Sequence, residues 1–192
     1  KTIDNPIKLS ANESALGPSP RAIEAFEKDK EKIYKYPESD SNQLRDNISK
    51  KFNIDSKRII CGAGSDQIFD LTCQLFLESG DEVVVTEFGF IMHRIYASLH
   101  GAKVLLAKEQ NYKASVDEIL KKVTNKTKIV FIANPNNPTG TYVSKSEILN
   151  LRQKLRSDIL LVVDDAYFEF LNKEDFTSGL DLFKDSQNVL VT

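Results

Sequence analysis

Short apolar runs recur along the chain, separated by stretches in which apolar residues follow a helical period. The runs consist mainly of Val, Ile and Leu on successive positions, which is typical of strands covered by helices on both faces. They predict strands over Ile59–Cys61, Glu82–Thr86, Lys103–Ala107, Ile129–Ala133, Ile159–Val163 and Asn188–Thr192.

Between these runs, apolar residues three and four positions apart predict amphipathic helices. Helix starts are marked by Ser19-Pro20, by a position near Ser41, and by the S-x-x-E capping boxes of Ser115 with Glu118 and Ser144 with Glu147. Two further helical faces run from Ile68 to Phe76, with a stop at Gly80, and from Ile91 to Leu99.

Strands and helices that alternate in this way predict an α/β fold with three layers. We expect a mostly parallel, doubly wound sheet with helices on both faces. Residues 1–40 are expected to form an extended segment and a helix, and residues 41–192 one large domain. A chain of 192 residues that is 41% hydrophobic can bury a core of that size.

The composition favours a small molecule as the binding partner. With 26 basic and 28 acidic residues and a net charge of -2, the chain has no electrostatic footprint for nucleic acid or an anionic membrane. Its apolar runs are far shorter than the roughly 20 residues of a transmembrane helix, and its start has no basic-then-apolar leader. Cys61 and Cys73 are too few and too far apart for a disulfide framework, so we expect both to pack as small apolar residues in a cytoplasmic protein.

A glycine-rich turn, Gly62–Gln67, joins a predicted strand to a helix. Its glycines allow a close backbone approach, and the free N–H groups of the helix's first turn favour an anion such as phosphate. The turn lacks the third glycine of a dinucleotide fingerprint, and the chain lacks the Gly-Lys-Ser/Thr of a Walker A loop. A simple tight turn with Ser65 as the N-cap is the alternative.

Polar groups follow the carboxyl ends of two strands, where open α/β sheets bind ligands. The loop Asn134–Gly140 contains two prolines that stiffen it, so the Asn137 amide is pre-positioned for a ligand oxygen. Asp164 ends the other strand, and its carboxylate is partly desolvated unless a cation or a strong donor meets it. That partner is either a metal ion, as in a Walker B strand, or the protonated ring nitrogen of a pyridine cofactor.

Other side chains bear on the same edge of the predicted sheet. Tyr167 lies beside Asp164 if helical geometry has begun there, whereas Asp165 is expected to face solvent or to cap the turn. Phe90 follows a strand and either lies against a flat cofactor or packs in the core. His93 and His100 have neither a third ligand nor metal spacing, so no metal site is predicted.

Together these residues resemble the fold-type I, pyridoxal-phosphate-dependent aminotransferases, in particular the histidinol-phosphate aminotransferase subgroup. Asn134–Gly140 looks like the NPxNPTG loop of that superfamily, and Asp164–Tyr167 looks like its D-x-A-Y segment, with the same order and spacing. The resemblance to the subgroup is carried by Lys8–Glu13, Gly17–Pro20 and Tyr36–Glu38, and the resemblance as a whole runs from Lys8 to Thr192.

The resemblance implies roles for the matching positions. Asp164 would pair with the pyridine nitrogen of pyridoxal phosphate, and Asn137 and Tyr167 would bond its 3-oxygen, which makes these three the expected catalytic residues. The phosphate would be held by Ala63, Gly64, Ser65 and Asp66, the ring would stack on Phe90, and Asn12 and Glu13 would lie near the substrate entrance. Tyr36 would reach the cofactor of a neighbouring subunit, which implies a homodimer with shared sites.

Several positions depart from the family pattern. Ser14-Ala15 stands where Asn-Pro is frequent, Gln67 replaces a frequent Glu, and His93 replaces a frequent Tyr. The Schiff-base lysine is expected shortly after the strand that ends at Thr192, followed by arginines for phosphate and carboxylate groups. We therefore expect the chain to be most of the large domain of an aminotransferase and to be inactive alone.

The resemblance implies transfer of an amino group between L-histidinol phosphate and 2-oxoglutarate, a reaction of histidine biosynthesis. An aromatic or aspartate aminotransferase, or a phosphoamino-acid decarboxylase, is the alternative within the same fold. An NTP-binding regulator with Asp164 as a Walker B acid is disfavoured by the missing Walker A loop. A cofactor-free structural or interaction module is the remaining interpretation.

Overall fold

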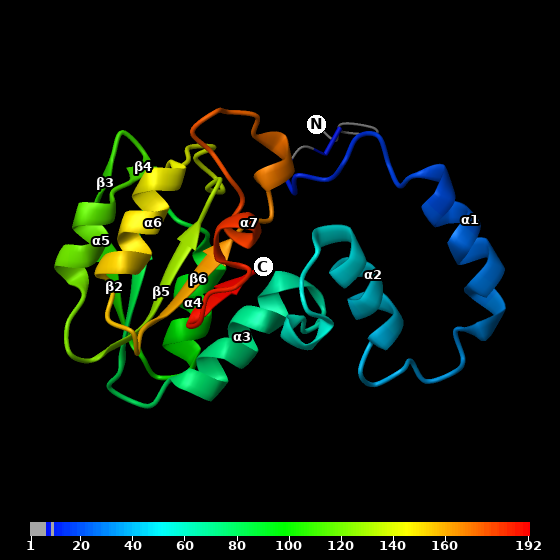
Figure 1. Ribbon diagram of the computed structural model, residues 1–192, viewed down its shortest axis with the longest axis horizontal. Coiled ribbons are helices and arrows are strands. Elements are labelled where there is room, and N and C mark those ends of the chain that lie inside the picture. Colours follow the sequence, from blue (N-terminus) through cyan, green and yellow to red (C-terminus); the bar gives the residue numbers. More distant parts are fainter. Residues whose placement is uncertain (1–6, 9) are drawn as a thin grey trace, which may run out of the picture. The chain divides into compact units, whose positions relative to one another are not determined.

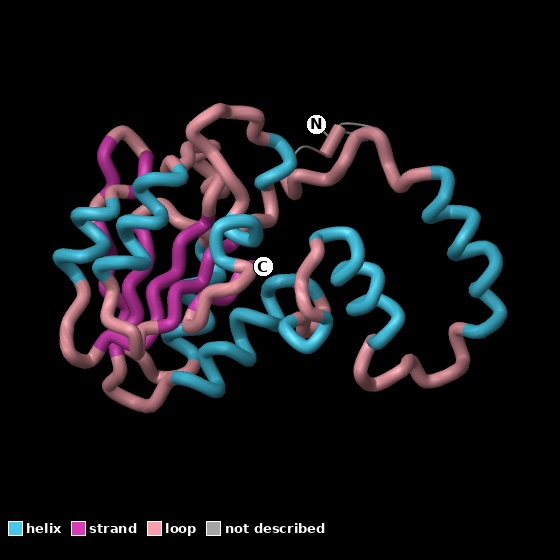
Figure 2. The backbone as a smooth tube through the Cα atoms, in the orientation of Figure 1, coloured by secondary structure: helices cyan, strands magenta, loops and turns pink. Residues whose placement is uncertain are grey.

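The computed structural model describes residues 7–8 and 10–192. The chain divides into two compact units, Lys1–Leu44 and Arg45–Thr192. All strands of the described residues lie in the second unit, whereas helices occur in both (Figure 2). Within the described part of the chain, no helix is both long enough and apolar enough to cross a membrane.

The first unit contains helix α1 (Pro20–Asp29) and the short 3-10 helix η1 (Lys30–Lys32). The Ser19 side chain accepts a hydrogen bond from the Ala22 N–H, and Pro20 occupies the first helical position, so the predicted start is confirmed. Exposed ion pairs three and four residues apart follow the charged stretch: Lys28 with Glu24, Lys30 with Glu27, and Lys32 with Asp29. Helix α2 (Asn42–Phe52) begins next to Ser41, as predicted, and crosses the boundary of the two units.

The second unit is built on a five-stranded parallel sheet. Its strands are β1 (Glu82–Thr86), β2 (Lys103–Ala107), β5 (Thr127–Ala133), β6 (Leu160–Asp164) and β7 (Val189–Val191), in the order β2-β1-β5-β6-β7. A small antiparallel hairpin, β3 (Glu109–Gln110) and β4 (Lys113–Ala114), follows β2. The mostly parallel sheet predicted from the apolar runs is therefore confirmed.

Helices cover both faces of this sheet (Figure 1). Helices α3 (Gly64–Phe76) and α4 (Ile91–Leu99) bury Phe69, Cys73 and Ala97 against Val83, Val85, Ile129, Phe131 and Val162. Helices α5 (Val116–Lys122), α6 (Lys145–Lys154) and α7 (Gly179–Phe183) bury Ile119, Leu151 and Phe183 against Val84, Val130, Ile132, Leu161 and Val163. Successive strand residues thus point into opposite cores, which is why the middle positions of the strands are apolar without alternation.

Three details differ from the prediction. Ile59–Cys61 is not a strand: it follows the 3-10 helix η2 (Ser56–Arg58) in extended form and pairs with no strand of the described residues. Cys61 is consequently exposed, whereas Cys73 is fully buried as predicted. The third difference is at β2, an edge strand of the sheet as described, where Leu106 remains 41% exposed.

The helix ends follow the local chemistry closely. Ser144 and Glu147 form a complete capping box at α6, while Ser115 at α5 makes only the half in which its hydroxyl accepts from the Glu118 N–H. Helix α3 ends at Phe76, four residues before the predicted stop at Gly80. Gly80 instead occupies the turn into β1 with a φ of +94°, a conformation that glycine adopts without strain.

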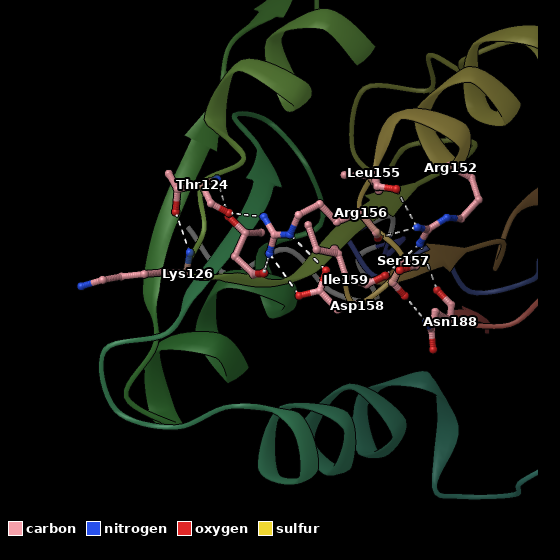
Figure 3. A network of polar contacts seen from close by, with 10 residues as sticks. Thr124, Lys126, Arg152, Leu155, Arg156, Ser157, Asp158, Ile159 and Asn188 are labelled. Atoms are coloured by element: carbon pink, nitrogen blue, oxygen red, sulfur yellow. Dashed lines mark hydrogen bonds and ion pairs between the residues drawn. The ribbon is translucent and has the colours of Figure 1, made fainter.

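Two guanidinium groups bind the chain together at the amino ends of β5, β6 and β7 (Figure 3). Arg152 donates to the carbonyl oxygens of Leu155, Arg156, Ile159 and Asn188, and Arg156 donates to those of Thr124 and Thr127. The five fixed donors of an arginine suit such multiple bonding. These bonds fix the strands at the edge opposite to the candidate site.

Candidate active site

The candidate site lies at the carboxyl edge of the sheet, at the point where the strand order reverses. The chain passes from β1 to β2 on one side, whereas β5 pairs with the other side of β1. In open parallel sheets a crevice forms outside the strand ends at such a switch point, and ligands bind there. The loops after β1, β5 and β6 all begin at this edge.

The loop after β5 is fixed at both of its ends. The Asn134 side chain accepts from the Val143 N–H at 2.9 Å and donates to the Val143 carbonyl at 3.2 Å. The Asn134 N–H donates to the Asp164 carbonyl at 2.9 Å, which ties the loop to the end of β6. The peptide bonds before Pro135 and Pro138 are both cis. In addition to the two prolines, the buried Asn134 side chain thus holds the two ends of the loop together through its bonds to Val143.

Within this loop, neighbouring asparagines have different functions. Asn136 is buried, and its amide donates to the Phe88 carbonyl at 3.1 Å and to the Thr139 hydroxyl at 2.8 Å, so it joins the loops after β5 and β1. Asn137 is partly exposed, and no described residue bonds to its amide. The Asn137 amide therefore has no use within the described fold, and its contact with a ligand stays a prediction.

Asp164 is placed at the end of β6 with both carboxylate oxygens in use. Its Oδ1 accepts from the Ala166 N–H at 3.2 Å, and its Oδ2 lies 3.2 Å from Nε2 of His93. Asp164 is 6% exposed and His93 is 2% exposed. A carboxylate this deeply buried needs donors, and a histidine of α4 supplies one of them.

The contact with His93 was missed by the reasoning from sequence. The sequence predicts no metal site at His93 and indicates no other polar partner for its ring, and within the described residues no group of three metal-binding side chains occurs. A usable signal was present, because His93 and Ala97 are four apart on α4 and both are buried. A polar side chain on the buried stripe of a helix requires a polar partner in the core.

Asp165 was expected to face solvent or to cap its own turn, and neither is correct. Its side chain is buried, and Oδ2 accepts from the N–H groups of Gly179 and Leu180 at the start of α7. Oδ1 has no partner among the described residues. Burial raises the pKa of the Asp165 carboxyl to about 7. Asp165 therefore anchors a helix 14 residues further along the chain.

The glycine-rich turn presents open donors at the amino end of α3. Ala63, not Ser65, is the N-cap residue, which corrects the alternative that assigned the cap to Ser65. The Ala63 N–H donates to Oε1 of Gln67 at 2.7 Å, and the Gly64 N–H donates to the Gly62 carbonyl at 2.9 Å. The N–H groups of Ser65 and Asp66 have no acceptor among the described residues. Of the four expected phosphate ligands, these two have free backbone donors.

The family model of aminotransferase class I and II matches residues 4–192. The chain belongs to this family. The family predicted from the two loop motifs is therefore confirmed.

The similar curated relatives include enzymes of one name within this family, histidinol-phosphate aminotransferase. A histidinol-phosphate aminotransferase of Pelagibacter ubique is 58% identical over 98% of this chain and 52% of that relative. The enzyme of the same name from Paramagnetospirillum magneticum is 45% identical over 98% of this chain and 52% of its own length. The crystal structure of histidinol-phosphate aminotransferase from Sinorhizobium meliloti, in complex with pyridoxal-5'-phosphate, matches with a TM-score of 0.88 and 24% identity. The matched region covers 94% of this chain and 49% of the Sinorhizobium meliloti chain. This match confirms the predicted fold.

The chain spans about half the length of the curated relatives it matches.

Two phenylalanines follow β1. Phe90 caps α4, is half-buried, and meets the His93 ring edge to face at a centroid distance of 5.6 Å. Phe88 is 43% exposed and lies 5.3 Å from the ring of Tyr112. Phe88 was not selected from the sequence, although its spacing from Phe90 by one glycine marks it as a second aromatic of the same loop. Either ring is available at the edge that carries the open amide of Asn137.

Tyr167 begins a short 3-10 turn, η3 (Phe168–Phe170), as its N-cap. The Phe168 N–H donates to the Asp165 carbonyl at 2.9 Å, so the turn starts directly after Asp164. Tyr167 is partly exposed, and its ring lies 6.1 Å from that of Phe170. The 3-10 helix begins only after Tyr167, so the predicted place of this side chain beside Asp164 stays a prediction.

The remaining predicted residues of the family site belong to the first unit. Tyr36 is 100% exposed, so its side chain is covered by no described residue. Glu13 forms an exposed ion pair with Lys8 at 2.9 Å, and Asn12 has a φ of +52°. Their expected roles at the cofactor and at the substrate entrance stay predictions.

Proposed function

We propose that this chain is the cofactor-binding part of a pyridoxal-phosphate-dependent aminotransferase that acts on L-histidinol phosphate and 2-oxoglutarate. The observation that carries the proposal is the buried Asp164 carboxylate at the switch point of the sheet. It lies on the same edge as the open Asn137 amide and the free N–H groups of Ser65 and Asp66. The names of the relatives support the substrate.

These residues fit pyridoxal phosphate by their chemistry. Ser65 and Asp66 offer backbone donors for a phosphate, and the dipole of the 13-residue helix α3 adds to their attraction for an anion. Ala63 and Gly64 then contribute by shaping the turn, because their own N–H groups are bonded within it. The Asn137 amide and the Tyr167 hydroxyl are the donors for a ring oxygen, and Phe90 or Phe88 would lie against the ring.

Asp164 would accept the N–H of the pyridine ring. When bound, the cofactor supplies an electron-withdrawing ring next to the carbon that loses its proton. Asp164 serves that chemistry by keeping the ring nitrogen protonated, which needs a negative charge held in place and away from water. Its low exposure and its two donors, the Ala166 N–H and His93, meet that need.

The full-length protein is proposed to be a cytoplasmic homodimer. The fully exposed Tyr36 supports this, because the family expectation is that it reaches the cofactor phosphate of a neighbouring subunit. The free thiols of Cys61 and Cys73 fit a reducing compartment. Asn12 and Glu13 are proposed to line the substrate entrance, and the lysine that bonds to the cofactor is expected beyond Thr192.

The test uses the full-length protein that contains this chain. Added pyridoxal phosphate should produce a visible absorbance band that borohydride fixes to the protein. Glutamate should then form from L-histidinol phosphate and 2-oxoglutarate faster than from aspartate or an aromatic amino acid. Absence of the band would contradict the cofactor, and a preference for aspartate or aromatic donors would contradict the substrate.

The variant Asp164→Asn tests the role of the buried Asp164 carboxylate directly. Asn has the size of Asp but no negative charge, so we expect a loss of about a hundredfold or more in kcat, because preorganised electrostatic contacts contribute on that scale. The matched control is Asp181→Asn, which removes the same charge from an exposed position on α7. Equal activity of Asp164→Asn and the control would exclude the role given to Asp164.

A further inference from the structure

His93 is the histidine of α4 whose ring is enclosed by aromatic side chains. It stacks on Phe131 of β5 with a centroid distance of 4.9 Å and an interplanar angle of 15°. It also meets the edges of Phe69 at 4.8 Å and of Phe90 at 5.6 Å. Three aromatic rings thus pack around the imidazole in the core.

An apolar ring would satisfy this packing equally well, so the packing does not explain the histidine. A buried ring nitrogen costs free energy unless it is hydrogen-bonded. The polar contact that His93 makes is between Nε2 and Oδ2 of Asp164, at 3.2 Å. Because an ionised carboxylate can only accept, Nε2 must carry the proton and donate it. The enclosed ring thus aims one N–H at Asp164.

This N–H completes the support of the Asp164 carboxylate. Oδ1 accepts from the Ala166 N–H and Oδ2 accepts from His93, so the two bonds fix the plane of the group. Each carboxylate oxygen can accept two hydrogen bonds, so the group retains the capacity to accept one from a ligand. A charge-assisted bond is also shorter and stronger than a neutral one.

We propose that His93 is a positioning residue that holds the Asp164 carboxylate in the orientation in which it receives the ring N–H of the cofactor. The inference rests on the proposed function. His93 acts through Asp164 and needs no contact with the cofactor.

The chain contains a matched control in the same helix region. His100, the C-cap residue of α4, pairs with Asp70 of α3 at 2.7 Å between Nε2 and Oδ1. This pair also joins a histidine to a carboxylate, but the His100 side chain is 26% exposed and Asp70 is not a strand-end residue. The variant His100→Phe therefore shows how much the loss of a histidine–aspartate contact lowers the stability of the fold when the cofactor site is not involved.

The experiment compares the full-length wild-type protein with His93→Phe, His93→Gln and His100→Phe. Phe keeps the stacked ring and removes the donor, whereas the Gln amide places an N–H near the position of Nε2. The readouts are the dissociation constant of pyridoxal phosphate, the nitrogen chemical shift of pyridine-¹⁵N-labelled cofactor, and the melting temperature without cofactor.

We expect His93→Phe to weaken cofactor binding about tenfold, the effect of one lost hydrogen bond to a charged group. Its ¹⁵N shift should move toward that of Asp164→Asn. His93→Gln should bring the dissociation constant to within about threefold of wild type and the ¹⁵N shift close to the wild-type value. His100→Phe should lower only the melting temperature.

Wild-type affinity and a wild-type ¹⁵N shift in His93→Phe would overturn the inference while the proposed function stands. A wild-type protein that binds no pyridoxal phosphate would overturn the proposed function and the inference with it. If His93→Phe does not fold, the Nε2 proton resonance of His93 in wild type, identified by its loss in His93→Gln, decides the matter. It should shift when cofactor is added while that of His100 does not, and an unchanged His93 resonance would refute the role.

Discussion

Asp165 gives the fold a dependence on pH that can be measured. The carboxyl group is 4% exposed, and its Oδ2 accepts from the first N–H groups of α7, at Gly179 and Leu180. Its Oδ1 is buried without a partner in the described part of the chain. Burial raises the pKa of Asp165 from 3.8 to about 7, and the two backbone N–H groups offset only part of that cost.

The sign follows from which state binds the proton more tightly. The folded protein keeps the Asp165 proton up to about pH 7, whereas the unfolded chain loses it near the ordinary pKa of 3.8. The stabilisation from this group is therefore fully present below pH 3.8 and is lost as the pH rises to about 7. A shift of about three pKa units, at about 1.4 kcal/mol each, sets the scale of the loss at about 4 kcal/mol.

The perturbation is Asp165→Asn, which keeps the shape and an acceptor for the Gly179 N–H but cannot ionise. Chemical denaturation between pH 4.5 and 8 gives the free energy of unfolding of each variant. We expect the difference between wild type and Asp165→Asn to change by about 3 kcal/mol over this range, with wild type losing stability relative to Asn. Asp185→Asn removes an exposed carboxylate just after the same helix that does not contribute to the raised pKa of Asp165, so this control should follow wild type closely. Parallel pH profiles of wild type and Asp165→Asn would refute the reasoning.

Three other substitutions test separate parts of the structure. Arg152→Met should lower the free energy of unfolding by about 2–4 kcal/mol, because four carbonyl oxygens lose a charged donor. Lys154→Met, which removes a charge from the same helix, is the control in chemical denaturation. Equal denaturation midpoints of the two variants would contradict a stabilising role of the Arg152 hydrogen bonds. Gly179→Ala should destabilise by about 1–3 kcal/mol, since a Cβ there would stand 2.9 Å from Cγ1 of Val163, and an unchanged melting temperature would show that the site has room. Asn137→Ala should weaken pyridoxal phosphate binding about tenfold with no change in melting temperature, because the described residues make no use of its amide; a loss of stability without loss of affinity would assign Asn137 to the fold instead.

The sheet was predictable because each of its central strands leaves a long local signal. β1, β5 and β6 are runs of five to seven residues that face two cores at once, so almost every position is apolar or buried, with Lys128 near the start of β5 as the exposed exception. Ile59–Cys61 has the same composition but only three residues. A run this short does not distinguish a paired strand from an extended connection, since the difference lies in whether a neighbouring strand exists.

The residues that the sequence did not yield are polar groups whose partners lie far away in the chain. His93 and Asp164 are 71 residues apart, and Asp165 and Gly179 are 14 apart. Local pattern indicates that a position is apolar on average, but it does not indicate which buried polar group meets which donor. The motif Asp164–Tyr167 identified the right segment and left open the environment of each carboxylate.

The different environments of the two adjacent carboxylates follow from the period of β6. Val162 packs into the core beneath α3 and α4, and Val163 packs into the core beneath α5, α6 and α7. Because side chains alternate along a strand, Asp164 continues on the side of Val162 and meets His93, whereas Asp165 continues on the side of Val163 and meets α7. A shift of one residue in the register of β6 would exchange the two carboxylates. The parallel pairing of Ala133 with Asp164, and the arginine bonds at the opposite end of the strand, exclude that shift. The position of the candidate catalytic carboxylate is thus set by the whole length of the strand that ends in it.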